Sequence, residues 1–95
     1  MNNFDKLIKY NEHIILNFDI SDDRIFKILL ALECILNFDD YQSFDLLKLC
    51  KFTKTPFDEI ESYIDILLSS SIITSIDTES KFINLYKLNY DVIQE

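Results

Sequence analysis

The sequence predicts a mainly α-helical domain that ends in one small β-hairpin. Apolar residues recur at helical spacing in four segments. These segments are residues 4–16, 22–38, 44–51 and 57–68. Alternating apolar and polar residues follow at 82–88, which is typical of a half-buried strand. The chain has 95 residues and is 48% hydrophobic, so it can bury one modest core and form a single domain over residues 1–95.

The first two predicted helices carry a large apolar surface. On the first helix, six residues share one face at helical spacing: Phe4, Leu7, Ile8, Asn11, Ile14 and Ile15. Ser21 is expected to cap the second helix, in which six residues form the core stripe: Ile25, Ile28, Leu29, Leu32, Ile35 and Leu36. Three further apolar residues lie outside these two faces: Leu16, Phe26 and Leu30. They either pack within the chain or form a homodimer seam through the first two helices.

The next two helices are expected after a short strand at residues 41–42. Ser43 is predicted to cap the helix at 44–51, and Thr55 to cap the following one, with Pro56 at its first position. Five residues of that last helix share the core face: Phe57, Ile60, Ile64, Leu67 and Leu68.

The C-terminal third of the chain is predicted to form the hairpin. A strand is expected at residues 72–76, a turn at 77–80 and a returning strand at 81–88. Residues 89–95 are expected to be a loose tail, since chain termini are often poorly ordered.

Composition restricts the classes of function. The net charge is −8 and the pI is about 4.4, which favours partners with a positive surface over phosphate backbones or anionic membranes. The chain has no Gly, which excludes Gly-rich phosphate loops and indicates an AT-rich genome. Cys34 and Cys50 lie in apolar segments and are expected to be buried, reduced thiols. Without a visible signal peptide or a long apolar run, we expect a cytoplasmic protein with no membrane contact.

The sequence contains no recognisable catalytic or metal-binding motif. His13 is the only histidine and lies away from the apolar stripe of its helix, so we expect it to be solvated. Paired carboxylates such as Asp39 and Asp40 occur at caps and turns, where acids serve structure. The two cysteines do not have zinc-ligand spacing. We therefore predict a protein that is not an enzyme and has no cofactor or metal site.

The order helix, short strand, helix, turn, helix and hairpin over residues 21–88 resembles the winged-helix (winged helix-turn-helix) family. Residues 57–73 look like the third helix of this family running into the hairpin, which is called the wing. Ile76-Asp77 and Phe82-Ile83 also look like the wing of protein-binding winged helices in PCI-domain scaffold subunits. The resemblance implies a winged-helix-like core at 21–88, preceded by a helix and turn at 1–20 and followed by the tail. The rival fold is a plain small helical bundle with a C-terminal hairpin.

In DNA-binding members of the family, the third helix enters the major groove and its exposed side chains contact bases and phosphates. The corresponding exposed positions here are acidic or uncharged: Asp58, Glu59, Glu61, Ser62, Asp65 and Ile66. Carboxylates repel phosphates, whereas acidic residues with an apolar neighbour suit a protein partner. These residues are therefore the candidate partner-binding site, and the alternative is an ordinary solvated helix face.

A weak basic set supports a rival hypothesis. Five lysines would contact DNA in a dimeric winged-helix transcriptional regulator: Lys48, Lys51, Lys54, Lys81 and Lys87. The sequence favours the alternative that Lys48, Lys51 and Lys54 are solvated residues that partly balance nearby carboxylates. Our leading hypothesis is a small acidic protein-interaction module. It would be an adaptor, or an inhibitor of a basic or nucleic-acid-binding protein, and by analogy would come from a phage or mobile element and mimic nucleic acid.

Overall fold

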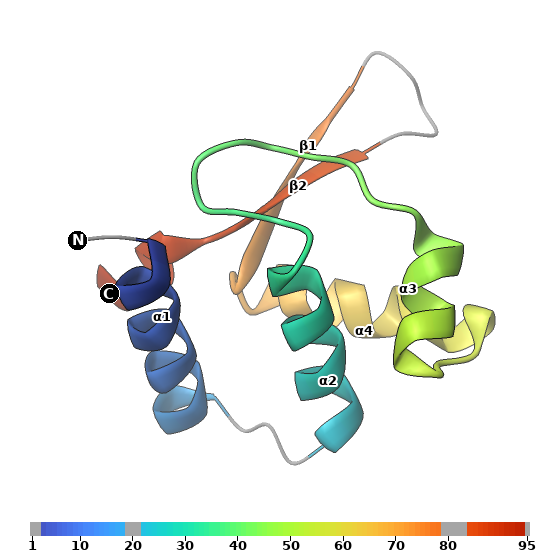
Figure 1. Ribbon diagram of the computed structural model, residues 1–95, viewed down its shortest axis with the longest axis horizontal. Coiled ribbons are helices and arrows are strands. Elements are labelled where there is room, and N and C mark those ends of the chain that lie inside the picture. Colours follow the sequence, from blue (N-terminus) through green and yellow to red (C-terminus); the bar gives the residue numbers. More distant parts are fainter. Residues whose placement is uncertain (1–2, 19–21, 79–83, 95) are drawn as a thin grey trace.

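The computed structural model describes residues 3–18, 22–78 and 84–94 (Figure 1). In these residues the chain forms four α-helices, a two-stranded hairpin and a final 3₁₀ turn. Their bounds are α1 Asn3–Asn17, α2 Asp23–Glu33, α3 Leu46–Thr53, α4 Phe57–Ser69, β1 Ile73–Asp77, β2 Asn84–Leu88 and η1 Tyr90–Gln94. The predicted fold class, mainly helical with a small hairpin, is confirmed.

The hairpin is antiparallel and is joined by a segment from the middle of the chain. Ile73 pairs with Leu88, and Asp77 pairs with Asn84. Gln42 forms an isolated bridge to Tyr86, in which each backbone N–H donates to the other residue's carbonyl, at 2.8 and 2.7 Å. The short strand predicted at residues 41–42 is thus a single bridge. The predicted turn extends beyond residue 78 and the returning strand begins at residue 81, so both lie partly outside the described residues.

The core is formed by one face of each helix together with the base of the hairpin. Its fully buried members include Leu29 and Leu32 of α2, Ile60 and Leu67 of α4, and Leu88 of β2. Burial of a large aliphatic side chain contributes about 1.5–3 kcal/mol, so these contacts dominate the stability of such a small domain. Figure 1 shows α1, α2 and α4 below the hairpin, with α3 to the side of α4.

The buried face of α1 differs from the prediction. Tyr10 and Ile14 are fully buried, whereas Phe4, Ile8 and Ile15 are 69%, 49% and 59% exposed. The Tyr10 hydroxyl donates to the Ile72 carbonyl at 2.5 Å, and this bond satisfies the phenol inside the core. The sequence pattern was misleading because a tyrosine with a buried partner can displace aliphatic residues from the core.

Several helix ends also differ from the prediction. The N-cap of α2 is Asp22, whose carboxylate accepts from the Arg24 N–H, and not Ser21 as predicted. Ser21 lies outside the described residues. Asp45 caps α3 in place of Ser43, because its carboxylate accepts from two backbone N–H groups of the first turn. Pro56 occupies the cap position of α4 and offers no side-chain bond, while Thr55 is buried with its hydroxyl 2.9 Å from that of Thr53.

Three apolar residues that were expected to lie inside are exposed. Phe57 is 54% exposed because it starts α4, one turn before the first buried residue, Ile60. Ile35 is 43% exposed because α2 ends at Glu33 and not at Phe38. Cys34 is also exposed, whereas Cys50 is buried as predicted, and both thiols are free.

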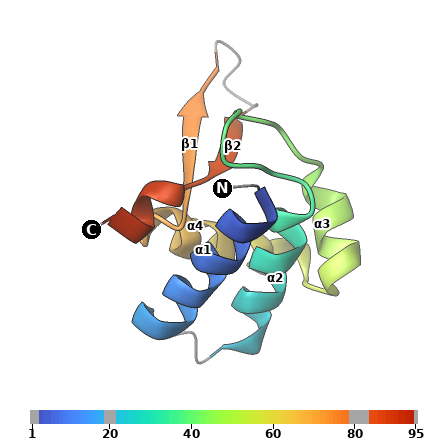
Figure 2. The same ribbon diagram turned by 60° about the vertical axis from the view of Figure 1, so that its left-hand side comes forward.

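Residues 89–94 of the predicted tail are ordered against the core, and residue 95 lies outside the described residues. Tyr90–Gln94 form η1, whose Val92 is only 2% exposed and belongs to the core. The Phe38 ring stands between the rings of Tyr10 and Tyr90, with centroid distances of 5.1 and 5.3 Å and edge-to-face geometry. Figure 2 shows η1 next to α1. The prediction was wrong because contacts with distant residues, which are invisible in local patterns, order the end of the chain.

A half-buried polar contact joins α1 to α2. The Asn11 side-chain amide donates to Glu33 Oε1 at 2.6 Å, while Glu33 Oε2 is buried without a partner among the described residues. Burial raises the pKa of Glu33 to about 7, and the hydrogen bond from Asn11 only partly opposes this effect. In the folded chain the neutral acid is therefore favoured below about pH 7.

This contact predicts that stability decreases as the pH rises. The unfolded chain has the ordinary glutamate pKa of 4.5, so the folded state binds more protons between about pH 4.5 and pH 7. With allowance for solvent screening, we expect a loss of about 1–2 kcal/mol across this window. Urea titrations at a series of pH values would measure it. Glu33→Gln should remove this pH dependence, whereas the control Glu12→Gln on the exposed side of α1 should leave it unchanged, and parallel curves for wild type and Glu33→Gln would contradict the assignment.

Candidate protein-interaction surface

The candidate site residues share the exposed face of α4, which we call the acidic face and define as Asp58, Glu59, Glu61, Ser62, Asp65 and Ile66. All six are exposed, and Ile66 is 47% exposed. The opposite side of the helix is anchored by Ile60, Ile64 and Leu67, which are buried. Because this packing fixes the rotation of α4, the carboxylates are held in defined positions.

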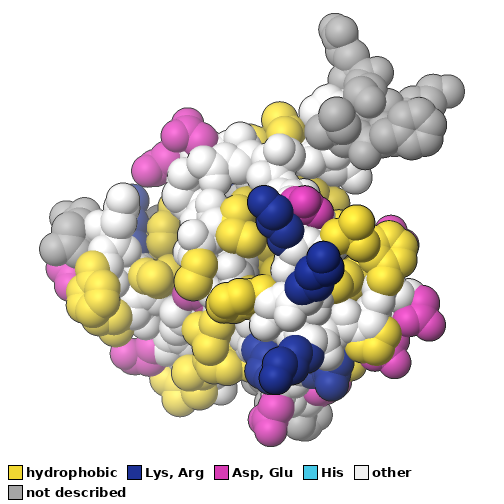
Figure 3. Space-filling model, turned by 45° about the vertical axis from the view of Figure 1, so that its right-hand side comes forward, with side chains coloured by type: hydrophobic (Ala, Val, Ile, Leu, Met, Phe, Trp, Pro, Cys, Tyr) yellow, Lys and Arg dark blue, Asp and Glu magenta, His cyan; other side chains and the backbone are white. Residues whose placement is uncertain are grey.

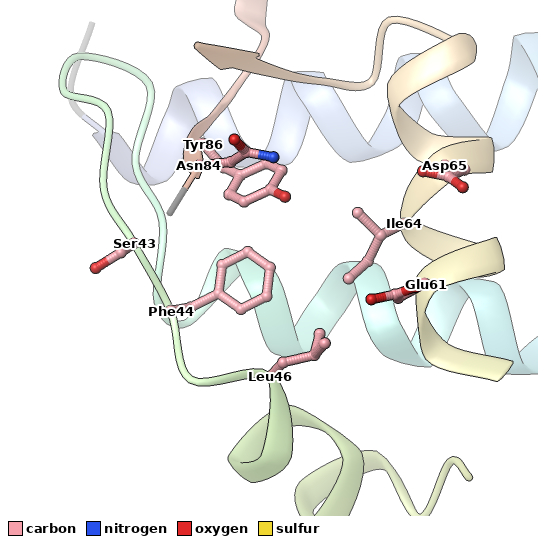
Figure 4. Close-up of a pocket in the computed structure, with 8 residues that line it drawn as sticks. All are labelled: Ser43, Phe44, Leu46, Glu61, Ile64, Asp65, Asn84 and Tyr86. Atoms are coloured by element: carbon pink, nitrogen blue, oxygen red, sulfur yellow. The ribbon is translucent and has the colours of Figure 1, made fainter. Parts of the chain in front are cut away.

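One edge of the acidic face borders a hollow of about 540 Å³ (Figure 4). The hollow is lined by residues from α4, from β2, from the segment before α3 and from the first residue of α3, namely Ser43, Phe44, Leu46, Glu61, Ile64, Asp65, Asn84 and Tyr86. The Phe44 and Tyr86 rings pack against each other at a centroid distance of 5.0 Å. Figure 4 shows the two rings across the hollow from α4. Ile64 and Glu61 project from α4 into the hollow, and Asp65 lies on the same helix farther from the rings.

The hollow is suited to a cation that has an apolar stem. Its lining combines two carboxylates with two aromatic rings, and none of its lining residues is Lys or Arg. A guanidinium or ammonium group gains from nearby carboxylates and from the faces of aromatic rings, while its methylene stem packs on apolar surface. A partner's Arg or Lys side chain has both of these properties.

The other edge of the acidic face is tied to α2. The Tyr63 hydroxyl donates to Asp22 Oδ2 at 3.2 Å. Desolvation, and then the Asp22 carboxylate, raise the pKa of Tyr63, so this phenol remains a donor at physiological pH. The Ser62 hydroxyl donates to the Glu59 carbonyl at 2.7 Å, within its own helix. The polar groups on this side thus have partners inside the chain, whereas Glu61 and Asp65 border the open hollow.

The lysines of the rival DNA-binding set are only partly brought together. Lys48 and Lys51 are exposed on α3, and Lys54 follows as the C-cap, where the Arg24 guanidinium donates to its carbonyl at 3.0 Å. Lys87 lies on β2, with its Nζ 4.9 Å from the centroid of the Tyr41 ring. Lys81 lies outside the described residues.

The residues that complete the hollow were missed in the sequence. Phe44 was assigned to a helix, and Tyr86 was recognised only as part of a half-buried strand. They meet because the Gln42 bridge carries residues 43–46 past Tyr86 of β2. A local pattern carries no signal for this pairing, since the partners are 42 positions apart in the chain.

The described residues also bear on metal binding and on membrane insertion. They contain no group of three or more His, Cys, Asp or Glu side chains placed to hold a metal ion. Within them, no helix has the length and apolar character needed to cross a membrane. His13 is half-buried, with its ring centroid 6.2 Å from that of Phe18.

Three comparisons with known proteins found no match for this chain, whether a family model, a curated protein or a solved structure. The surface is therefore interpreted from its own geometry.

Proposed function

We propose that this chain is a small acidic winged-helix protein-interaction module, an adaptor or an inhibitor of a basic or nucleic-acid-binding protein. The observation that carries the proposal is the hollow that Glu61 and Asp65 line together with the rings of Phe44 and Tyr86. A basic side chain of the partner enters this hollow, and the exposed Ile66 at the other edge of α4 adds apolar contact. The remaining carboxylates steer the encounter and disfavour acidic competitors.

The winged-helix part of the proposal is supported by the order of the elements. Helix α2, the Gln42 bridge, α3, α4 and the hairpin follow one another as in the family resemblance. Helix α1 and η1 pack together beside this set. In this arrangement α4 takes the place of the third helix, so the acidic face takes the place of the surface that would contact DNA.

The rival function, a dimeric DNA-binding regulator, is less well supported by the same geometry. Carboxylates on α4 would face phosphates, and each would oppose the release of counterions that drives such binding. We therefore expect no binding to random duplex DNA at about 10 mM salt, the condition that favours such contacts most. Binding that weakens steeply with added salt would establish the regulator instead.

The proposal is tested by capture of partners from an extract of the source organism. The bait is the full chain, and the matched bait is Asp58→Lys/Glu61→Lys/Asp65→Lys, checked by circular dichroism for an intact fold. We expect the wild-type bait to retain a basic protein, and the reversed bait to lose it, because the carboxylates provide the complementary charge. If both baits retain the same proteins, as identified by mass spectrometry, the binding site lies elsewhere.

A further inference from the structure

A second exposed groove lies between α2 and α3, away from the acidic residues of α4. It has a volume of about 240 Å³ and a mainly apolar lining: Ala31, Cys34, Ile35, Lys48, Leu49 and Phe52. Phe52 is 73% exposed and Ile35 is 43% exposed, so two large apolar side chains meet solvent at its border. Leu30 and Leu47, on the same two helices, are also exposed.

The groove follows from the sizes of the residues where the helices meet. Ala31 and Leu49 are buried and hold α2 and α3 together. The small side chain of Ala31 leaves space that none of its neighbours fills. Because α2 ends at Glu33, Ile35 lies beyond the helix and borders this space.

One lysine, Lys48, lines the groove, and further basic residues lie on the two helices that form it. Five of the nine Lys and Arg residues belong to α2, α3 and the residue that ends α3, namely Arg24, Lys27, Lys48, Lys51 and Lys54. The bond from Arg24 to the Lys54 carbonyl holds the start of α2 against the end of α3. Figure 3 shows dark blue side chains gathered on this side of the molecule, with hydrophobic side chains next to them. A chain with a net charge of −8 thus carries five of its nine Lys and Arg residues on or next to the two helices that form this groove.

We infer that this groove binds an amphipathic helix of a partner protein, in which acidic residues flank a row of apolar ones. Apolar residues at positions i, i+3 or i+4, and i+7 of that helix pack on Phe52 and Ile35. Its Asp or Glu side chains meet Lys27, Lys48 and Lys51. A phosphate backbone would contact the lysines but would not bury Phe52 and Ile35. A protein helix would do both, so the groove favours a protein helix over nucleic acid. This surface is separate from the acidic face and does not depend on the function proposed above.

Two designed peptides test the inference against the full chain. Both are helices of about 14 residues, a length of about 21 Å, with the same apolar row, and they carry either Glu or Lys at the flanking positions. Fluorescence anisotropy would measure affinity, and amide chemical shifts would locate the site. We expect the acidic peptide to bind at least about tenfold more tightly than the basic one, with affinity that falls as salt is added. The largest shifts should lie at residues 31–35 and 48–52.

Matched variants separate the groove from general surface effects. Phe52→Ala and Lys48→Glu should each weaken the acidic peptide by about fivefold or more, because each removes one part of the complementary surface. Phe4→Ala and Lys9→Glu make the same changes at exposed positions of α1 and should have no effect. The inference is overturned if the two peptides bind equally, if the acidic peptide fails to bind at about 1 mM, or if its shifts lie elsewhere. A duplex or single-stranded oligonucleotide that binds the groove more tightly than the acidic peptide would also overturn it, in favour of nucleic acid.

Discussion

Replacing Val92 with Asp is expected to lower the free energy of unfolding by about 3–5 kcal/mol. Val92 is 2% exposed and lies in η1, which packs beside α1. A carboxylate at this position would lose its hydration inside an apolar core, and it would either remain charged without a partner or take up a proton. Urea or thermal denaturation followed by circular dichroism would measure the loss.

The control for this substitution is Ile8→Asp, which introduces the same charge at a residue that is 49% exposed on α1. We expect it to change stability by less than about 1 kcal/mol, since the new carboxylate stays in water. A small effect of Val92→Asp, comparable with that of the control, would show that the C-terminal residues do not contribute to the core.

Reversing the two carboxylates at the hollow, with Glu61→Lys/Asp65→Lys, is expected to weaken partner binding by about a hundredfold or more. The substitution removes the negative charge that attracts the partner's basic side chain, and it places two cations in the lining of the hollow. Each buried charge contact at an interface is worth about 2–5 kcal/mol when truncated, so reversal of two is a large change. Isothermal titration with the captured partner would measure the affinity.

The matched control is Asp58→Lys/Glu59→Lys, which changes the net charge equally but lies outside the lining of the hollow. We expect only a severalfold loss, mainly through a slower association rate and at low salt. Equal losses for the two double variants would mean that general charge, and not the hollow, determines the binding. In that case the captured partner would still bind the acidic face, and only the role of the hollow would be rejected. The two experiments therefore test different parts of the proposal.

The helical elements could be predicted because their signals are local. In α2 and α4, apolar spacing correctly marked Ile28, Leu32, Ile60 and Leu67 as core residues. The ends were less accurate, since Asp and Ser are both suitable caps and only the local geometry selects between Asp45 and Ser43. On α1 the prediction of the buried face was wrong, because the acceptor of the Tyr10 hydroxyl, Ile72, is 62 positions away in the chain.

The candidate site was predicted only in part. Charge and spacing on α4 were enough to place Glu61 and Asp65 on an exposed face. The aromatic side of the hollow depends on the pairing of Gln42 with Tyr86, and the apolar groove depends on the packing of Ala31 against α3. Both pairings join residues far apart in the chain, and short-range periodicity contains no information about them.

The sequence by itself determined the class of fold, the acidic charge of α4 and the separation of that charge from the lysines of α3. These properties follow from residue type and from repeats within a few turns of helix. Only the tertiary structure decided that Val92 belongs to the core, that Phe44 and Tyr86 line one hollow with Glu61 and Asp65, and that an apolar groove lies between α2 and α3. The physical reason is that a residue is buried only where two parts of the chain pack together. The free energy of those contacts depends on residues that are distant in the sequence, so a local pattern does not predict it.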